Sequence, residues 1–215
     1  MTTVTQTAVR GERTDLERVT DTLGRAFQRD PVACWVTPDG RRRRSVLPAL
    51  FGLLAAATLD DGEVHVRPDR RAAALWEPPS GPIKDPGDEA TFTAALHEAI
   101  GPDALRVVEL LVLLATQRPA DPAWHLTFVG VVPALQGCGV GTALLRPMLD
   151  RCDAEDQPVY LEASSRGSRR LYERLGFRVI GEIELPRGGP PVWPMWREPG
   201  TPGSWGWQAT RELSR

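Results

Sequence analysis

The feature that most constrains this chain is an apolar run that stops at a proline, passes three closely spaced glycines and resumes with helical spacing. It reads VVPALQGCGVGTALL and occupies residues 131–145. Glycine lets a backbone bend and approach a ligand with no side chain in the way. The free N–H groups and the positive end of a helix attract anions. The segment therefore predicts a strand-to-helix junction that either binds a phosphate or is a tight turn without a ligand.

Two nucleotide loops are possible alternatives for this junction. The phosphate loop of NTPases ends in Gly-Lys-Ser/Thr, and no lysine follows the glycines here. A dinucleotide loop needs glycine at the sixth place counted from Gly137, where this chain has Thr142. Glu162 falls at the end of the next expected strand, where a ribose ligand would sit, so this second alternative is weakened and stays open.

The composition is that of an ordinary globular protein. The 215 residues are 41% apolar and 25% charged, enough for one core. A net charge of -2 gives no reason to expect nucleic acid or a membrane surface as a partner, and a monomer or homodimer is expected. Cys34, Cys138 and Cys152 are too few for a disulfide framework or a zinc site, so we expect free thiols, no metal and a cytoplasmic location.

Hydrophobic spacing predicts the elements of the first half. A helix from Leu16 is expected to be capped by Thr14 or Asp15. Arg41–Arg44 could hold a phosphate, but a solvated helix start is favoured. The expected elements are a strand at Thr7–Gly11, helices at Leu16–Phe27 and Val46–Leu59, and a hairpin of Glu63–Arg67 with Ala72–Pro78.

The second half alternates strands and helices, which predicts a mixed α/β sheet with right-handed crossovers. We expect one domain over residues 1–198, a helical insertion at 79–119 over the acceptor site, and a loose tail at 199–215 that carries Trp205 and Trp207. The expected elements are helices at Asp88–Ala99 and Asp103–Gln117, strand Trp124–Val131, helix Gly139–Cys152, strand Val159–Ala163, helix Ser168–Leu175, and strands Phe177–Glu184 and Val192–Arg197.

Two motifs in order resemble the GNAT superfamily of N-acetyltransferases. The family's acetyl-CoA loop has the pattern Gln/Arg-x-x-Gly-x-Gly/Ala, which Gln136, Gly139 and Gly141 match. Its second signature, a strand and then Leu-Tyr-Glu-x-Leu-Gly-Phe, resembles LYERLGF at residues 171–177. Within the family, the chain is most similar to puromycin N-acetyltransferase and its relatives. The resemblance implies a mostly antiparallel sheet flanked by helices, with a V-shaped splay at the coenzyme strand.

The resemblance also implies where acetyl-CoA would bind. The amides of Val129 and Val131 would face the thioester oxygen and the pantetheine arm, and Gly130 between them is expected to form a bulge. Cys138 replaces the loop's usual basic residue, so weakened but not abolished coenzyme binding is expected. Ser165 replaces the usual asparagine, and its hydroxyl can still donate with a shorter reach. The implied contacts are Val129, Val131, Gln136, Gly137, Cys138, Gly139, Val140, Gly141, Thr142, Ser165 and Ser168.

Acyl transfer to an amine needs an acid for the leaving thiolate and a base for the amine. Tyr172 stands at the family's acid position, with packing on a helix as the alternative. His125 lies eleven residues before Gln136, where histone-type members carry a glutamate, and its reference pKa of about 6.5 suits a base. It would share a strand face with Val129, although it could simply be packed. Glu162 is the second candidate base, or a group that orients an ammonium.

These assignments predict an acetyl-CoA-dependent N-acetyltransferase that acts on a primary amine of a small molecule, with detoxification or antibiotic resistance as a role. Two alternatives stay open at the level of sequence. One is acetylation of a protein N-terminus or lysine, since one fold serves both substrate classes. The other is a non-catalytic acyl-CoA-binding domain, against which an intact Tyr172 counts.

Overall fold

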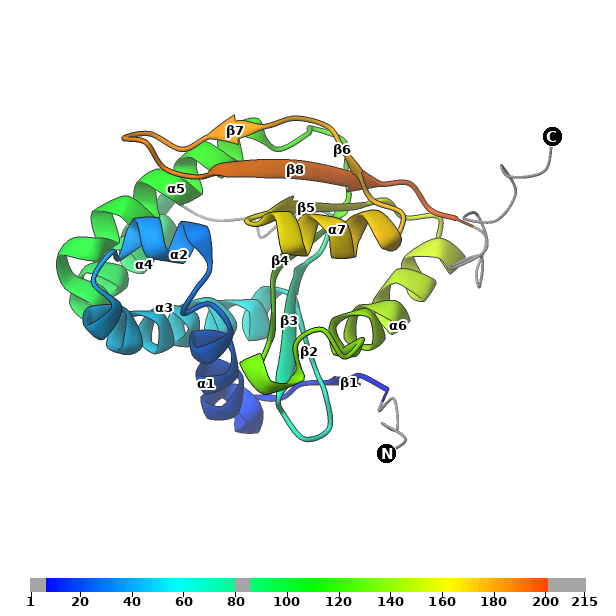
Figure 1. Cartoon of the computed structure of the whole chain (residues 1–215), viewed down its shortest axis with the longest axis horizontal. Helices are drawn as coiled ribbons and strands as arrows, with labels where there is room; N and C mark the ends of the chain where they lie inside the picture. The colour runs from blue at the N-terminus through cyan, green and yellow to red at the C-terminus, as the bar shows by residue number, and fades with distance from the viewer. Residues whose placement is uncertain (1–6, 80–85, 201–215) are drawn as a thin grey trace.

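One central sheet organises the chain, which the computed structural model describes over residues 7–79 and 86–200 (Figure 1). Its strands run in the order β1-β2-β3-β4-β5-β8-β6, and β7 also pairs with β8. Every pairing is antiparallel except that of β4 with β5. The strands are β1 (Val9–Arg10), β2 (Glu63–Val66), β3 (Ala72–Glu77), β4 (Trp124–Val131), β5 (Val159–Ala163), β6 (Arg178–Val179), β7 (Ile183–Glu184) and β8 (Pro191–Arg197). The sheet is thus mixed and mostly antiparallel, as expected.

Helices cover both faces of this sheet, and each predicted helix is present with bounds that shift by a few residues. In the described residues, no helix has both the length and the apolar character needed to cross a membrane. The helices are α1 (Leu16–Ala26), α2 (Pro31–Val36), α3 (Gly40–Asp61), α4 (Pro86–Ile100), α5 (Ala104–Gln117), α6 (Val140–Ala154) and α7 (Arg166–Arg174).

Strand alternation divides the core between the two faces. In β3, Ala73 and Leu75 pack with α1 and α3, whereas Ala74 and Trp76 pack with α6 and α7. Figure 1 shows α1 and α3 on one side of the strands and α6 on the other. The face that carries α1 and α3 is called the α1 face below, and the opposite one the α6 face.

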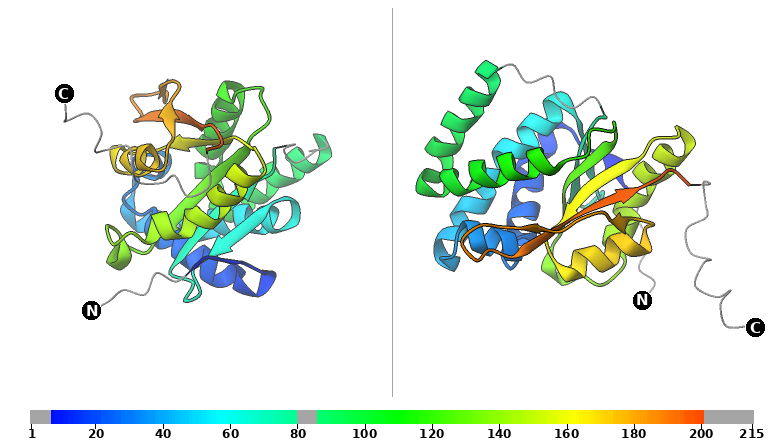
Figure 2. Two further views of the ribbon diagram at one scale, coloured as in Figure 1. Left: turned by 90° about the vertical axis from the view of Figure 1, so that its right-hand side faces the viewer. Right: turned by 90° about the horizontal axis from the view of Figure 1, so that it is seen from above.

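The strands β4 and β5 separate after a short contact. They pair only at three positions, the last of which joins Leu126 to Leu161. Beyond it, β4 continues to Val131 with a neighbour on the β3 side alone. This separation is the V-shaped splay that the sequence led us to expect, and Figure 2 gives two further views of the strands.

The helices α4 and α5 tie the α1 face to the far edge of the sheet. Leu96 and Val107 pack against α3, while the other side of α5 contacts Leu185 and Val192 of the β7–β8 region. The chain leaves α5 at Arg118, which returns it to the sheet beside β4. The insertion therefore ends beside β4, and residues 80–85 of it lie outside the described part; its position over the acceptor site stays a prediction.

The strand expected at Phe177–Glu184 is wrong as a single element. It consists of β6 and β7, which pair with the same strand β8 at different places. Between them, Ile180 still donates to the carbonyl of Pro194, but Pro194 has no N–H to return a bond. The ladder is interrupted there for this reason. The expected tail from 201 onward, with Trp205 and Trp207, lies outside the described residues.

Candidate active site

The glycine loop forms an open backbone turn directly before α6. Gly137 and Gly139 have φ of +73° and +77°, a conformation that side chains rarely adopt, and a Cβ built on either would meet nothing within 4 Å. Gly141 instead lies against Leu171 of α7, so its small size serves packing. Cys138 is exposed, and Thr142 lies in the first turn of α6. The bare turn with space in front of it fits a pyrophosphate at a helix N-terminus.

The amides of Val129 and Val131 point into the splay. Val132 donates its N–H to the carbonyl of Arg71, on the β3 side. Because successive residues of a strand point their amides to opposite sides, those of Val131 and Val129 point away from β3, toward the gap left by β5. The side chain of Gln136 donates to the carbonyl of Val131 at 3.0 Å, which holds the loop against this strand.

Gly139→Asp is expected to weaken acetyl-CoA binding at least tenfold. The substitution places a side chain and a negative charge in the open space where the turn would meet phosphate, and it strains a backbone at φ +77°. Calorimetric titration measures the change. Gly188→Asp is the matched control, because Gly188 has φ +68° with equally open surroundings on the β7–β8 turn. Equal affinity losses in the two variants would contradict a phosphate site.

The bulge in β4 is at Thr127, and the expected bulge at Gly130 is wrong. Leu75 pairs with Phe128 and Trp76 with Leu126, so Thr127 is the extra residue. Gly130 is required for another reason: a Cβ there would lie 2.8 Å from Leu23 of α1.

The same bulge overturns the expectation that His125 and Val129 share a face. Val129 packs on the α6 face, with the cluster that includes Leu126 and Leu161. His125 pairs with Glu77 of β3 and Tyr160 of β5, whose neighbours Trp76 and Leu161 belong to that same cluster. Strand alternation therefore places His125 on the α1 face.

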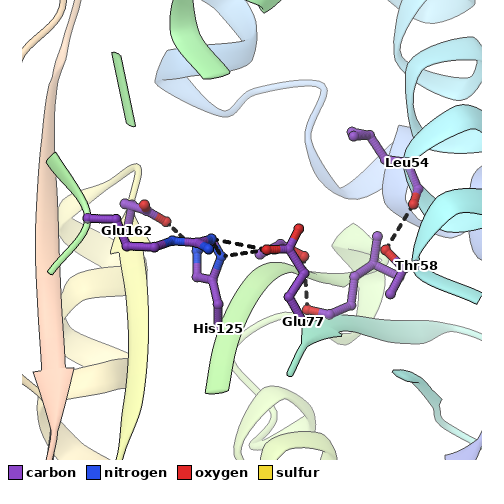
Figure 3. Close-up of polar contacts among 8 residues, drawn as sticks. Leu54, Thr58, Glu77, His125 and Glu162 are labelled. Atoms are coloured by element: carbon purple, nitrogen blue, oxygen red, sulfur yellow. Dashed lines mark hydrogen bonds and ion pairs between the residues drawn. The ribbon is translucent and has the colours of Figure 1, made fainter. Parts of the chain in front are cut away.

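His125 lies in a chain of charged groups that runs from the buried Glu162 to the partly exposed Glu77 and Arg118 (Figure 3). Its Nε2 is 2.7 Å from Oε2 of Glu162, and its Nδ1 is 3.3 Å from Oε2 of Glu77. Arg118, just after α5, contacts both Nδ1 of His125 and Oε2 of Glu77. Side chains of His125 and Glu162 are 10% and 8% exposed. The structure thus brings the two candidate bases into direct contact.

The hydrogen bonds assign the proton on this imidazole. Arg118 has only donors, so in the neutral imidazole that fits this contact Nδ1 of His125 is the acceptor, and Nε2 carries the proton and donates it to Glu162. His125 is then positioned to orient Glu162, with its acceptor nitrogen already occupied. Burial raises the pKa of Glu162 to about 7, against the opposing charge of Arg118. A carboxylate with that pKa is a suitable base near neutrality, so the geometry favours Glu162 over His125.

His125→Phe distinguishes the two assignments. If Glu162 is the base, losing the Nε2–H donor makes its charged form less favourable, and the acidic limb of the kcat/KM profile moves to higher pH. If His125 is the base, the limb disappears. His65→Phe is the matched control, because His65 is also largely buried and 2.9 Å from a carboxylate, Glu63, but lies with β2 away from this chain of groups. Repeating the profile with an acceptor of another pKa excludes the ionisation of the acceptor itself.

Tyr172 is buried on the inner side of α7, with a residue exposure of 6%. Burial raises its pKa, and the negative charges of Asp30 and Glu162 raise it further. The phenol therefore stays protonated at neutral pH, and both carboxylates lie within electrostatic reach of it. Ser165 and Ser168 cap α7 reciprocally, with the Ser168 amide 3.1 Å from Oγ of Ser165.

Three charged residues of the site were missed in the sequence: Glu77, Arg118 and Asp30. Each comes from a segment far from the two motifs, so no spacing connects them. A buried strand that ends in a glutamate, ALWE at residues 74–77, is the one signal that could have drawn attention to Glu77. Within the described ranges, no group of three or more His, Cys, Asp or Glu side chains is arranged to hold a metal ion.

Comparisons with known proteins agree with one another. The model of the Acetyltransferase (GNAT) family matches residues 84–177. An uncharacterised N-acetyltransferase of Schizosaccharomyces pombe is 28% identical over 207 residues, which cover 90% of this chain and 84% of that protein.

Solved structures share the fold. "Histone acetyltransferase HPA2 and related acetyltransferase" from Corynebacterium glutamicum superposes with a TM-score of 0.70 at 29% identity, over 93% of this chain and 99% of that one. A polyamine N-acetyltransferase of Drosophila melanogaster that forms N-acetylagmatine has a TM-score of 0.56 at 19% identity, over 89% and 98% of the chains.

Proposed function

We propose that this chain, an acetyl-CoA-dependent acetyltransferase whose residues 84–177 match the GNAT family model, acetylates a primary amine of a small molecule. The observation that carries the proposal is the buried carboxylate Glu162, oriented by His125 at the point where β4 and β5 separate. Acetyl-CoA supplies the activated thioester when bound. Its phosphates would be held by the backbone of residues 137–142, and its arm by the outward amide of Val131.

In the proposed reaction, Glu162 takes a proton from the ammonium of the acceptor, so that the neutral nitrogen can attack. The amide of Val129 donates to the thioester oxygen as negative charge develops there. A bond forms between the acceptor nitrogen and the acyl carbon as the C–S bond breaks, and Tyr172 gives its proton to the departing sulfur. The balance is one ammonium and one thioester converted to one amide, one thiol and one proton.

Buried charge supports a small and cationic acceptor. Glu162 and Glu77 are the two carboxylates that contact His125, and Arg118 is the guanidinium that contacts His125 and Glu77. The negative charge of Asp30 also acts on Tyr172. A negative site attracts ammonium groups and lowers the cost of removing them from water. Detoxification of such an amine, the role that the resemblance to puromycin N-acetyltransferase implies, is part of this proposal.

A protein acceptor is the second candidate, favoured by the 29% identity to a structure whose name includes histone acetyltransferase. Incubation with acetyl-CoA and a panel of small amines, beside a lysine-rich peptide, decides between the two while free thiol release is followed. Faster turnover with at least one small amine is expected. A rate with the peptide that exceeds the rate with every amine would contradict the proposal.

A further inference from the structure

Both nitrogens of the His125 ring face a carboxylate (Figure 3). Nε2 is 2.7 Å from Oε2 of Glu162 on β5, and Nδ1 is 3.3 Å from Oε2 of Glu77 at the end of β3. The side chain of His125 is only 10% exposed, so water screens these contacts little. A histidine between two carboxylates ordinarily takes a second proton, since both neighbours favour its charged form. The hydrogen bonds of this site instead correspond to a neutral ring.

Arg118 is the group that opposes the second proton. Its guanidinium contacts Nδ1 of His125, the nitrogen to which that proton would bind, and offers it a donor. It also lies 3.1 Å from Oε2 of Glu77, the carboxylate that would accept a hydrogen bond from a protonated Nδ1. Tyr160 of β5 is a further titratable neighbour, 5.3 Å from the imidazole between ring centroids, and burial raises its pKa, so it stays uncharged. Arg118 therefore occupies both partners of the bond that an imidazolium would make.

The charge of His125 determines how strongly Glu162 holds a proton. A neutral ring donates one hydrogen bond to this carboxylate. An imidazolium would place a positive charge 2.7 Å from it and stabilise its charged form, so Glu162 would be a weaker base. The guanidinium of Arg118 contacts His125 and Glu77, on the far side of the ring from Glu162. Its charge acts on Glu162 from a greater distance than the charge of an imidazolium would.

We propose that Arg118 is a positioning residue of the acyl transfer, which keeps His125 neutral so that Glu162 remains basic enough to take the proton from the amine. Arg118 follows directly after α5, so the helical insertion delivers it to the sheet. The insertion then contributes a side chain to the chemistry of the site. This inference rests on the proposed function, because it takes Glu162 as the base.

Nuclear magnetic resonance of the ring Cε1–H group follows the ionisation of His125, one of three histidines in the chain. The spectrum of His125→Phe identifies its signal. In the parent protein, the ring should stay neutral over the pH range of activity. Arg118→Met removes both the donor and the charge, and it should raise the midpoint of the His125 titration by about one to three pH units. The acidic limb of the kcat/KM profile should move the opposite way, to lower pH by about one unit, with slower turnover above it.

Arg151→Met is the matched control. Arg151 lies 3.1 Å from one oxygen of Glu63, whose other oxygen is 2.9 Å from a ring nitrogen of His65. The same three residue types therefore meet between α6 and β2, away from the site, and this variant should leave the His125 titration and the limb unchanged. Arg118→Lys keeps a charged donor and should restore most of the parent behaviour.

A His125 ring that is charged at neutral pH in the parent protein overturns the inference, and this measurement needs no variant. A limb of Arg118→Met that moves to higher pH, with an unchanged His125 titration, overturns it too. That result is expected if Arg118 acts only through its charge, which lowers the pKa of Glu162. Acetylation of no amine in the panel would refute the proposed function, whereas the His125 titration is measured without any substrate. Melting temperatures show whether a loss of rate reflects unfolding.

Discussion

Tyr172→Phe is expected to lower kcat by about 100- to 10,000-fold, the usual contribution of a general acid, with little change in acetyl-CoA affinity. The ring is kept, so the packing against Phe177 at 5.9 Å between centroids persists. Only the proton for the departing sulfur is removed. Single-turnover kinetics measure the chemical step directly, and calorimetry measures the affinity.

Tyr160→Phe is the control for this experiment, since Tyr160 is the other tyrosine of the chain and is equally buried. Burial raises the pKa of its hydroxyl, and so does the charge of Glu162, with which the hydroxyl interacts. Loss of that hydroxyl should move the acidic limb of Glu162 to higher pH and have a small effect on kcat above the limb, where the two variants are compared. Comparable losses in the two variants, or nearly full turnover in Tyr172→Phe, would remove Tyr172 from the mechanism.

Glu162→Gln is expected to lower kcat/KM above pH 7 by about 100- to 10,000-fold, because the amide accepts no proton from the acceptor. In the parent protein, activity should rise with pH through an acidic limb near the Glu162 pKa of about 7. That limb should be absent from the residual activity of the variant. Glu184→Gln, an exposed glutamate on β7, is the control and should retain both rate and limb.

The same substitution should stabilise the protein. The pKa of Glu162 in the folded state is about 7, above its ordinary value of 4.5, so the folded state holds the proton more tightly. Stability therefore falls as the pH rises from about 4.5 to about 7 and stays lower above it. Glutamine has no charge to bury, and it still accepts from His125. Above pH 7 the gain in free energy of unfolding would be up to about 3 kcal/mol, and none is expected near pH 4.

Denaturant titrations at the two pH values check this gain. A variant no more stable than the parent at pH 8 would show that the carboxylate is better solvated than its burial indicates. A lost rate together with increased stability would mark Glu162 as a residue kept for chemistry at a cost to stability.

The sequence predicted helices and strands well where neighbouring residues in the chain determine the structure. Strands β4 and β5 have the predicted bounds, because each is an apolar run bounded by proline or glycine signals. The turn at Gly137 and Gly139 could also be predicted, because glycine adopts a positive φ without the steric cost that a side chain brings. The contact between His125 and Glu162 could be expected in part, since both were assigned to neighbouring strands near one motif.

The sequence could not predict which face of the sheet each residue of β4 occupies on the two sides of Thr127. A bulge changes which face the following residues occupy, and this one exists only in the pairing with β3, where Leu75 pairs with Phe128 and Trp76 with Leu126. A glycine at position 130 is compatible with a bulge or with close packing of another element against the strand. Only the position of Leu23, which packs against Gly130, decides between the two. Arg118 and Asp30 reach the site through tertiary packing of α5 and α2, which no periodicity encodes.

The gap between β4 and β5 has a consequence for the lifetime of the folded protein. Amides of Val129 and Val131 face an opening within the sheet, where a neighbouring strand would normally bind them. A ligand that occupies this opening stabilises the folded state by mass action, by about 2.7 kcal/mol at one hundred times its Kd. The level of acetyl-CoA would then set the protein's resistance to unfolding and proteolysis as well as its rate. A cell depleted of the acetyl donor would lose the enzyme together with its substrate.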